Sequence, residues 1–565
     1  MGAKMPAPVH RCFNMRNPFA KAVVLSVVLL LLLCAMLRSD SMDVKHAIVK
    51  SANAAKAAMT QEPLDRQGPE IFRAPAEEDD VEEAQPEPDP ATSVYSNSSI
   101  SMTCDRDMEK LLILQDKYGL NTKFEYTKRY VKISRQNIKR KSITKLNQRF
   151  MAEQPQVVDV TKQSPQHQPH TCEEPLVVPV TQSPYPNTAN ASDFIFGVST
   201  TYKRFKDPQT SSIHEWTYWL TDGKGKSNGG KLVLLLLDAS EEELVDAWTR
   251  LDAVGIDVDV YQSDSRMEMA VRYLTLVPTL YNHPDRPGRK WVVTCDDDTF
   301  FPAFNALTEK FEEYDHTMPM YIGTLSEDVN NVERHGAQAF GGGGVFLSVP
   351  LAKKIAEDYE SCKTPAKIKE ANTGWGPQGD VLLRKCIYEN SDVKLTSLWD
   401  LWQLDLYGDP SGFYESGIKP LSLHHYRGGG WHIAHPWQYT KIAHLCGEDC
   451  SLQRFKTKDN YVISNGFSVA HYPKGIDFDF GQLERTFHPA PEDKGWNLDY
   501  MFGPQRPSLH KTGKKISWDG QETILNADGS VSQIYVRKAD DWRWKTPSGE
   551  PMSKMDGVIE LVWFD

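Results

Sequence analysis

The chain is 565 residues long and carries 64 Lys and Arg against 76 Asp and Glu, a formal net charge of −12. This acidic balance argues against a nucleic-acid partner, because binding to phosphate backbones relies on an excess of basic side chains. The length is sufficient for one large domain with appended segments.

The N-terminus has the pattern of an uncleaved membrane anchor. Residues 1–21 contain four basic side chains and no acid, and residues 22–37 are apolar apart from Ser26. No small-x-small cleavage site directly follows this run, which favours an anchor over a signal peptide. We predict a cytosolic tail over 1–21, one span over 22–37 and a luminal remainder, since the basic side stays in the cytosol. So short a span favours the Golgi or the endoplasmic reticulum.

The next segment, residues 38–100, lacks hydrophobic periodicity and contains acidic runs and a Pro-rich stretch. Such a composition buries too little apolar surface to fold, so we predict a disordered stem. Two N-glycosylation sequons, at Asn97 and Asn190, fit a luminal location. Seven cysteines follow the anchor. Because that number is odd, at least one stays unpaired within the chain, and Cys295 in its apolar run is the candidate.

Residues 101–190 are predicted to be a partly ordered lead-in. Apolar spacing predicts a helix over 107–120. The stretch 129–149 is basic and contains no acid. We interpret it as a solvated face, with attraction to an acidic acceptor or to phosphates as the alternative. Residues 151–190 are rich in Gln and Pro and are predicted to be loop.

From residue 193 onward, apolar runs alternate with amphipathic ones. The predicted elements are strands over 194–198, 231–237, 258–261 and 291–295, and helices over 241–251 and 267–281. This alternation predicts an α/β fold with a mostly parallel sheet and helices on both faces.

Three consecutive acids, Asp296, Asp297 and Asp298, directly follow the last of these strands. Adjacent carboxylates repel one another unless a cation or a basic side chain lies beside them. Ligands of open α/β sheets gather at the carboxyl ends of the strands, and hard divalent cations take oxygen ligands. We interpret the three acids as a metal and phosphate site; a solvated acidic loop is the alternative.

Three further motifs carry candidate functional residues. The glycine turn 340–344 enters a strand and lets the backbone approach a ligand closely, or serves tight packing. Asp380 lies in a Gly- and Pro-rich turn before an amphipathic stretch, as an N-cap, a catalytic base or both. His424 and His425 follow an apolar strand, where one of them could complete a metal shell.

In this order the motifs resemble those of the fringe-like glycosyltransferases, glycosyltransferase family 31. The later segments are most similar to the fringe-related branch of fungi and plants, and the resemblance covers roughly residues 193–475. It implies a GT-A nucleotide-sugar-binding fold, Mn²⁺ and a UDP-sugar donor. It also implies inverting transfer of a hexose or N-acetylhexosamine to a hydroxyl of a glycan or glycoprotein, forming a β1,3-linkage.

The resemblance implies roles for single residues as well. Asp380 would be the catalytic base, while Asp298 and His424 would hold the metal, with His425 as the substitute for His424. The other implied roles are Asp296 at the donor ribose, Asp297 beside the donor sugar, Gly342, Gly343 and Gly344 against the donor or acceptor, and a disulfide between Cys362 and Cys386 that braces the Asp380 loop.

The catalytic domain is therefore predicted over 191–475, followed by a β-rich extension over 476–565. The extension contains five Trp residues, which we interpret as a packed layer, with carbohydrate binding as the alternative. An alternative function for the whole chain is a catalytically silent fringe-like protein that binds luminal glycans or acts as a chaperone. Gly379 keeps this alternative open, because the family commonly carries a second acid at that position.

Overall fold

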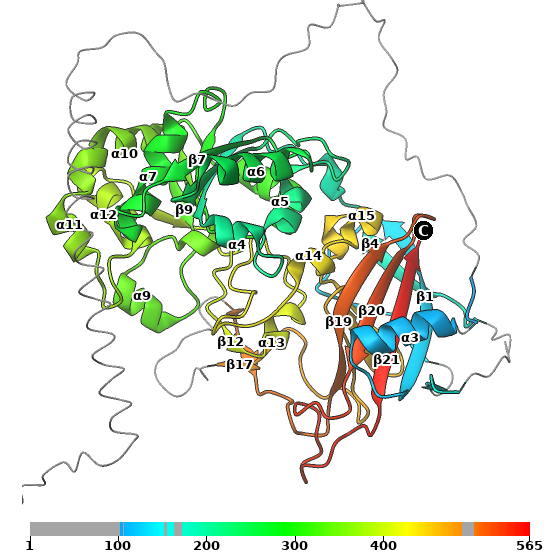
Figure 1. Cartoon of the computed structure of the whole chain (residues 1–565). Coiled ribbons are helices and arrows are strands. Elements are labelled where there is room, and N and C mark those ends of the chain that lie inside the picture. The colour runs from blue at the N-terminus through cyan, green and yellow to red at the C-terminus, as the bar shows by residue number, and fades with distance from the viewer. Residues whose placement is uncertain (1–101, 106, 152–154, 163–171, 489–501) are drawn as a thin grey trace, which may run out of the picture. The chain divides into compact units, whose positions relative to one another are not determined.

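The computed structural model describes residues 102–105, 107–151, 155–162, 172–488 and 502–565 (Figure 1). The predicted tail, anchor and stem and the sequon at Asn97 lie outside these residues. Asn190 of the second sequon is exposed. Within the described residues, no helix has both the length and the apolar character that crossing a bilayer requires.

The helices of the described residues are α3 (Met108–Lys117), α4 (Tyr202–Lys206), α5 (Ile213–Leu220), α6 (Glu241–Asp252), α7 (Met269–Tyr281), α8 (Phe304–Phe311), α9 (Val329–His335), α10 (Val349–Cys362), α11 (Pro365–Glu370), α12 (Gly379–Asn390), α13 (Ser411–Tyr414), α14 (Pro436–Tyr439) and α15 (Ala443–Cys446). Short 3₁₀ turns are η1 (Pro186–Thr188), η2 (Gly341–Gly343) and η3 (Glu448–Cys450).

The strands of the described residues are β1 (Lys123–Gln136), β2 (Ile143–Lys145), β3 (Gln156–Asp159), β4 (Leu176–Thr181), β5 (Phe194–Thr200), β6 (Lys231–Leu237), β7 (Val258–Ser263), β8 (Trp291–Thr294), β9 (Tyr321–Gly323), β10 (Val345–Ser348), β11 (Leu395–Ser397), β12 (Tyr407–Gly408), β13 (Arg454–Lys456), β14 (Tyr461–Ser464), β15 (Ser468–His471), β16 (Leu483–Glu484), β17 (Phe487–His488), β18 (Gln505–Arg506), β19 (Ile516–Leu525), β20 (Val531–Arg537) and β21 (Asp556–Phe564).

A seven-stranded sheet in the order β11-β9-β10-β8-β5-β6-β7 forms the centre of the α/β part. Pairs β5–β6, β6–β7, β5–β8 and β9–β11 are parallel, whereas β10 runs antiparallel to β8 and β9. The prediction of an α/β fold with a mostly parallel sheet is confirmed, and each strand and helix predicted between 194 and 295 is present. The order places β8, and the acids that follow it, in the interior of the sheet.

Helices cover both faces of this sheet (Figure 1). After Lys231, strand β6 is aliphatic, and it is buried from both sides: Leu232 and Leu234 face one core, and Val233 and Leu235 face the other. Helices α5, α6 and α8 contribute to the first core, and α7, α10 and α12 to the second. A strand buried on both faces reads as a continuous hydrophobic run, which explains why its sequence signal was clear.

A second, ten-stranded sheet combines both ends of the described chain. Strand β1 pairs in parallel with β21 and β4, while β13, β14, β15, β19 and β20 extend the sheet. Strands β3 and β4 lie within 151–190, so the prediction that this segment is loop was wrong. The segment is polar overall, so its two short strands give only a weak sequence signal. In β4, the side chains on either side of Pro179 are buried, and Pro179 itself is less buried.

The basic stretch 129–149 is not simply a solvated face, and that interpretation needs correction. The Arg129 side chain is buried and pairs with Glu173 at 2.6 Å. The Arg140 guanidinium donates hydrogen bonds to the carbonyl oxygens of Gly417, Asp449 and Ser451. These arginines attach the lead-in to other segments, because a buried guanidinium needs several acceptors at once.

Most of the described tryptophans of the C-terminal extension are packing residues, as predicted. Trp518, Trp544 and Trp563 are buried, and the Trp563 indole donates to Gln533 Oε1 at 2.6 Å. Trp542 is 53% exposed. Trp496 lies outside the described residues.

The cysteine predictions are also met within the described residues. Disulfides join Cys104 to Cys172, Cys362 to Cys386 and Cys446 to Cys450. Cys295 is a free, buried thiol, and burial raises its pKa well above the usual range. The Cys362–Cys386 bridge links α10 to α12, the helix that carries Asp380.

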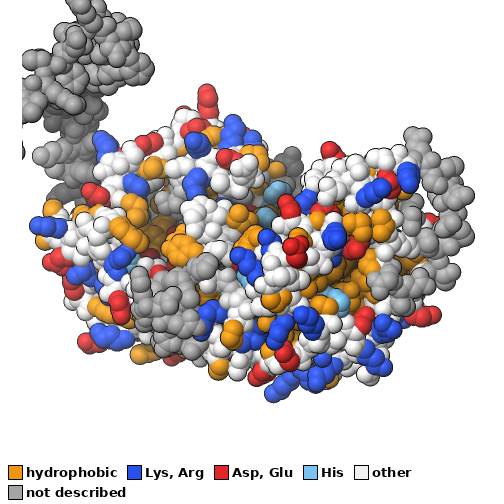
Figure 2. Space-filling view, turned by 90° about the horizontal axis from the view of Figure 1, so that it is seen from below, with side chains coloured by type: hydrophobic (Ala, Val, Ile, Leu, Met, Phe, Trp, Pro, Cys, Tyr) orange, Lys and Arg blue, Asp and Glu red, His pale blue; other side chains and the backbone are white. Residues whose placement is uncertain are grey.

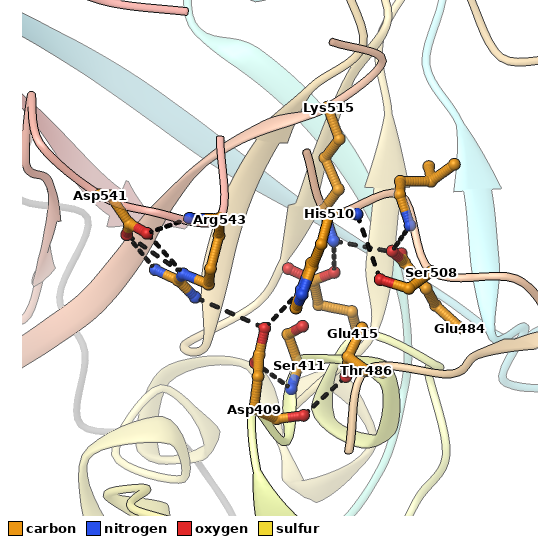
Figure 3. A network of polar contacts seen from close by, with 12 residues as sticks. Asp409, Ser411, Glu415, Glu484, Thr486, Ser508, His510, Lys515, Asp541 and Arg543 are labelled. Carbon is orange, nitrogen blue, oxygen red and sulfur yellow. Dashed lines mark hydrogen bonds and ion pairs between the residues drawn. The ribbon is translucent and has the colours of Figure 1, made fainter. Parts of the chain in front are cut away.

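Buried ion pairs join the segment that includes α13 to the C-terminal strands (Figure 3). Lys515 is fully buried and bonds to Glu415 and Glu484, and Asp409 pairs with His510 at 2.6 Å. Arg543 bonds to Asp541 and Asp519. We call these residues the junction network. The visible face of the molecule in Figure 2 intersperses charges of both signs, so this face presents no broad basic surface.

Candidate active site

The acids predicted to hold a metal lie together with one histidine. Asp296, Asp298 and His424 each place a ligand atom within 4.8 Å of the other two. His424 Nε2 lies 3.0 Å from Asp298 Oδ1 and 3.4 Å from Asp296 Oδ2. The structure therefore brings together two of the three consecutive acids and the first of the two adjacent histidines, residues more than 120 positions apart in the sequence.

Local pairing explains how His424 reaches the acids. Phe300 and Leu423 exchange both backbone hydrogen bonds, at 2.9 and 2.8 Å, so the residue after Leu423 lies beside the loop that follows β8. The opposite edge of the imidazole faces Gln403, whose carbonyl oxygen is 3.3 Å from Nδ1. The ring is 97% buried and fixed by these neighbours.

The glycine turn packs against this ring. A Cβ atom at Gly342 would collide with the His424 imidazole, and one at Gly343 would collide with Thr324. Gly344 has a φ of +88°, in the region that favours glycine. This contact is the tight packing named as the alternative for the turn, and the approach of Gly342, Gly343 and Gly344 to a donor or acceptor stays a prediction.

If Asp296, Asp298 and His424 bind a divalent cation, replacing Gly342 with Ala is expected to displace the His424 ring and to weaken the affinity for Mn²⁺ by about 10- to 100-fold, as loss of ligand support does elsewhere. Titration with Mn²⁺ followed by electron paramagnetic resonance measures the affinity. Gly481→Ala is the matched control, because a Cβ there meets only the flexible Asp479 side chain at 3.2 Å. Equal affinities in the two variants would contradict the role of the turn.

His425 points away from the acids. Its backbone has a φ of +57°, and its Nδ1 lies 2.9 Å from the buried carboxylate of Asp405. The ring stacks on Trp431 at 4.0 Å between centroids. His424 is therefore the histidine grouped with Asp296 and Asp298, whereas His425 pairs with Asp405.

Asp297 is held by an arginine that the sequence reasoning missed. Its carboxylate accepts two hydrogen bonds from Arg204, at 2.7 and 2.6 Å, and another from Thr200. Arg204 lies on α4, directly after the carboxyl end of β5. A basic residue in the first turn after a buried strand was the available signal, because neighbouring strand ends share one edge of the sheet.

Arg427 is a second missed cation next to the acids. It donates to Glu215 Oε1 at 3.0 Å and to Ser212 Oγ at 3.1 Å, and it also contacts the Asp297 carbonyl oxygen. Both guanidinium groups interact electrostatically with Asp297 and Asp298. The site therefore combines carboxylates with two arginines.

The charges within the cluster shift one another. Burial raises the pKa of Asp296 to about 6, with the Asp298 and Asp297 charges adding to the effect. Burial opposes the charged form of His424, but the Asp298 and Asp296 carboxylates outweigh it and raise its pKa to about 9. For Asp298, His424 outweighs burial and lowers the pKa. The cluster thus stabilises positive charge at its centre.

Asp380 lies in the first turn of α12, whose N-cap is Gln378, so Asp380 is not itself the cap. Burial and the nearby Asp296 raise its pKa to about 7, while hydrogen bonds to the Gly341 backbone and to Tyr273 act in the opposite direction. The glycine turn therefore contacts both His424 and Asp380. Tyr273, on α7, is a further residue that the sequence alone did not indicate.

A second group of metal-ligand type is occupied by a lysine. Asp259, His283 and Asp285 also have ligand atoms within 4.8 Å of one another. Lys231 Nζ lies 3.1 Å from both aspartates, and His283 pairs with Asp259 at 2.9 Å. Because the ammonium group already supplies the positive charge, this group is an ion-pair cluster at the amino ends of β6 and β7.

Comparisons with known proteins give partial matches. Residues 330–428, well under half of the chain, match a family model described as "Protein of unknown function, DUF604". This range contains the glycine turn, Asp380 and His424. A peroxynitrite isomerase of Mycobacteroides abscessus is 31% identical over 71 residues, 13% of this chain and 34% of that protein. The chain thus spans about a third of the curated relative that it matches.

Several solved glycosyltransferases share a distant likeness. Mouse xyloside xylosyltransferase 1 matches with 10% identity and a TM-score of 0.25 over 36% of this chain and 85% of that chain. A mannosyltransferase from Pyrobaculum calidifontis, solved with GDP-Man and Mn²⁺, matches with 14% identity and a TM-score of 0.24 over 38% of this chain and 59% of that chain. TM-scores below 0.5 do not establish a shared fold, so function is inferred from the site's own geometry.

Proposed function

We propose that this protein is a metal-dependent, inverting glycosyltransferase with a GT-A type catalytic domain. It would move a hexose or N-acetylhexosamine from a UDP-sugar to a hydroxyl of a glycan or glycoprotein, forming a β1,3-linkage. The observation that carries the proposal is the grouping of Asp296, Asp298 and His424 beside two arginines, with the separate carboxylate of Asp380 across the same glycine turn.

The donor set suits a divalent cation such as Mn²⁺. Two carboxylates and one imidazole are ligands that Mn²⁺ accepts, and the ligand atoms already converge within 4.8 Å. Asp298 and His424 would hold the ion, with Asp296 next to it. When bound, Mn²⁺ supplies Lewis-acid neutralisation of the charge that develops on a leaving diphosphate. Arg204 and Arg427 add positive charge beside Asp297.

Asp380 would act as the general base. Inversion requires a single in-line displacement, so a carboxylate on the face opposite the leaving group must accept the proton of the acceptor hydroxyl. A pKa of about 7 keeps a substantial fraction of Asp380 ionised at neutral pH while making it a stronger base than an ordinary carboxylate. Because the chain keeps an acid at position 380, an active transferase is favoured over the catalytically silent alternative.

We further propose that the protein is a single-pass type II protein of the Golgi or endoplasmic reticulum membrane, with the catalytic domain in the lumen. The apolar run 22–37 with its basic N-terminal flank supports this proposal. The exposed sequon at Asn190 and the three disulfides are compatible with an oxidising, glycosylating compartment.

The test is a donor screen combined with Asp380→Asn. UDP release from a panel of UDP-sugars is measured with Mn²⁺ and with chelator. Asp380→Asn is expected to lower kcat by about 10²- to 10⁴-fold, the usual contribution of a general base, while metal-dependent UDP binding persists. Asp358→Asn is the control, because Asp358 pairs with Lys354 at 2.7 Å, one turn away on the same helix, α10.

The outcomes separate the candidate functions. Metal-dependent release from one UDP-sugar, lost in Asp380→Asn, would support the transferase and identify its donor. If the protein binds UDP in a metal-dependent way but releases no UDP from any UDP-sugar with any acceptor mixture, the catalytically silent alternative is favoured. If the purified protein binds no UDP in the presence of Mn²⁺, the transferase proposal fails.

A further inference from the structure

An exposed tryptophan lies in the loop that precedes Asp380. Trp375 keeps 69% of its surface exposed, the largest exposed fraction of the large hydrophobic side chains in the described residues. A single exposed apolar side chain is ordinary in itself. What distinguishes Trp375 is that its loop is fixed and that its neighbours lead directly to the candidate catalytic residues.

The loop around Trp375 is held by its own polar side chains. Asn372 Oδ1 accepts hydrogen bonds from the backbone N–H groups of Gly374 at 2.9 Å and Gly376 at 3.1 Å. Gln378 Nε2 donates to the carbonyl oxygen of Gly376 at 3.0 Å. Gly374 and Gly376 have φ values of +115° and +90°, so only glycine fits this turn without strain. These hydrogen bonds fix the backbone of the loop that carries Trp375.

One face of the indole is covered by an arginine. The Arg334 guanidinium carbon lies 4.0 Å from the ring centroid, a cation–π contact that orients the ring. His335 approaches at 6.2 Å between ring centroids and is itself held by Thr373 at 2.6 Å. With one face and one edge fixed, the rest of the indole remains open to solvent.

Neighbouring aromatic rings connect Trp375 to the turn that contacts Asp380, the candidate catalytic base. His335 also contacts Phe340, at 6.3 Å between centroids. Phe340 immediately precedes Gly341, whose backbone N–H bonds to Asp380. Trp375 is therefore two ring contacts away from the glycine turn, and five residues before Asp380 on the same loop and helix.

Resting on the proposed function, we infer that Trp375 is a specificity-determining platform for an oligosaccharide acceptor: a pyranose ring next to the reacting sugar stacks on the open face of the indole. Pyranoses present an apolar C–H face, and a rigid indole offers a large apolar area at little entropic cost. The acceptor is thus a glycan of at least two sugars. Asp380 addresses the hydroxyl of the terminal sugar, and Trp375 binds its neighbour.

Fluorine NMR of protein labelled with 5-fluorotryptophan tests the binding without any turnover. Trp375→Phe assigns the Trp375 resonance, and Trp542→Phe assigns that of Trp542. Trp542 is a matched reference, since it is 53% exposed and packs with Lys511 at 5.2 Å. The probes are lactose, N-acetyllactosamine, cellobiose, laminaribiose and mannobiose with their monosaccharides. We expect at least one disaccharide to shift the Trp375 resonance alone, and its monosaccharides to have a weaker effect.

Kinetics supply the second readout. With an accepted oligosaccharide, Trp375→Ala is expected to raise the acceptor KM about tenfold, the value of one good aromatic contact. Both kcat and the donor KM should stay unchanged, Trp375→Phe should recover part of the loss, and Trp542→Ala should behave as wild type. No shift of the Trp375 resonance with any glycan, or an unchanged acceptor KM in Trp375→Ala, would overturn the inference.

Failure of the proposed function is recognised separately. It would appear as missing metal-dependent UDP binding in the wild-type protein, whatever the state of Trp375. In that event the NMR titration still decides whether Trp375 binds glycans. Failure of the present inference alone would leave UDP binding and release intact and remove only the preference for longer acceptors.

Discussion

Replacing Asp298 with Ala is expected to abolish Mn²⁺-dependent UDP release, with a loss of about 10³-fold or more, because several kcal/mol of leaving-group stabilisation depend on the metal. Asp298 is the acid closest to His424, at 3.0 Å, and its carboxylate holds the His424 pKa above its ordinary value. Without that charge, the Mn²⁺ affinity should fall as well, which electron paramagnetic resonance titration measures directly.

The fold should survive this change, because the partner left behind can adapt. His424 can lose its proton once the Asp298 charge is removed, so no uncompensated charge remains buried. Thermal unfolding of the metal-free protein should therefore change little. If Asp298→Ala is unfolded, Asp298→Asn takes its place. Asn keeps the volume of the side chain, so this variant reports on metal binding in the folded protein.

The ion-pair cluster at the other end of the sheet provides the control. Asp285→Asn removes an acid from the second His/Asp group, where Lys231 supplies the positive charge. We expect unchanged Mn²⁺ affinity and unchanged UDP release in this variant. Full activity of Asp298→Ala, or an equal loss in Asp285→Asn, would show that the metal site lies elsewhere.

The α/β sheet could be predicted because its strands are buried on both faces and its helices are amphipathic. β6 and α6 occupy almost the same residues as the sequence indicated. Strands of the ten-stranded sheet were harder to recognise. β4 contains Pro179, and β1 carries exposed as well as buried positions, so neither gives a simple pattern. Nor does composition reveal that β1 pairs with β21, over 400 residues later.

The candidate site was predictable where chemistry is concentrated in short motifs. Three adjacent acids at a strand end and a histidine at another apolar run are visible without a structure. Arg204 and Arg427 were missed because each is one basic residue among many, and only the fold brings them next to Asp297. The choice of His424 over His425 likewise required backbone geometry, since the two side chains point to different carboxylates.

The part of the chain after residue 476 is integral to the described structure, and Lys515→Met should show it. Lys515 is fully buried and bonds to Glu415, after α13, and to Glu484 in β16 (Figure 3). Glu484 has Arg506 as a further partner at 3.0 Å, whereas Glu415 keeps the Ser468 hydroxyl at 2.7 Å and the more distant charge of Arg454. Removing the ammonium group therefore leaves the largely buried Glu415 carboxylate without its directly bonded cation.

We expect Lys515→Met to lower the free energy of unfolding by about 3–5 kcal/mol, the cost of breaking a buried pair from one side. Urea denaturation measures this loss. The adjacent Lys514→Met is the control: Lys514 pairs with Asp477 at the surface, where both side chains are about half exposed or more. Such a pair contributes about 0–1 kcal/mol.

A second variant separates the ion pair from other effects of the substitution. In Lys515→Met combined with Glu415→Gln, the buried carboxylate is neutralised, so part of the lost stability should return. Because Glu415 belongs to the segment that continues into His424, a loosened junction network should also lower UDP release before the protein unfolds globally. Equal stability of Lys515→Met and Lys514→Met would show instead that the C-terminal strands are held to the segment that includes α13 by apolar packing rather than by these ion pairs.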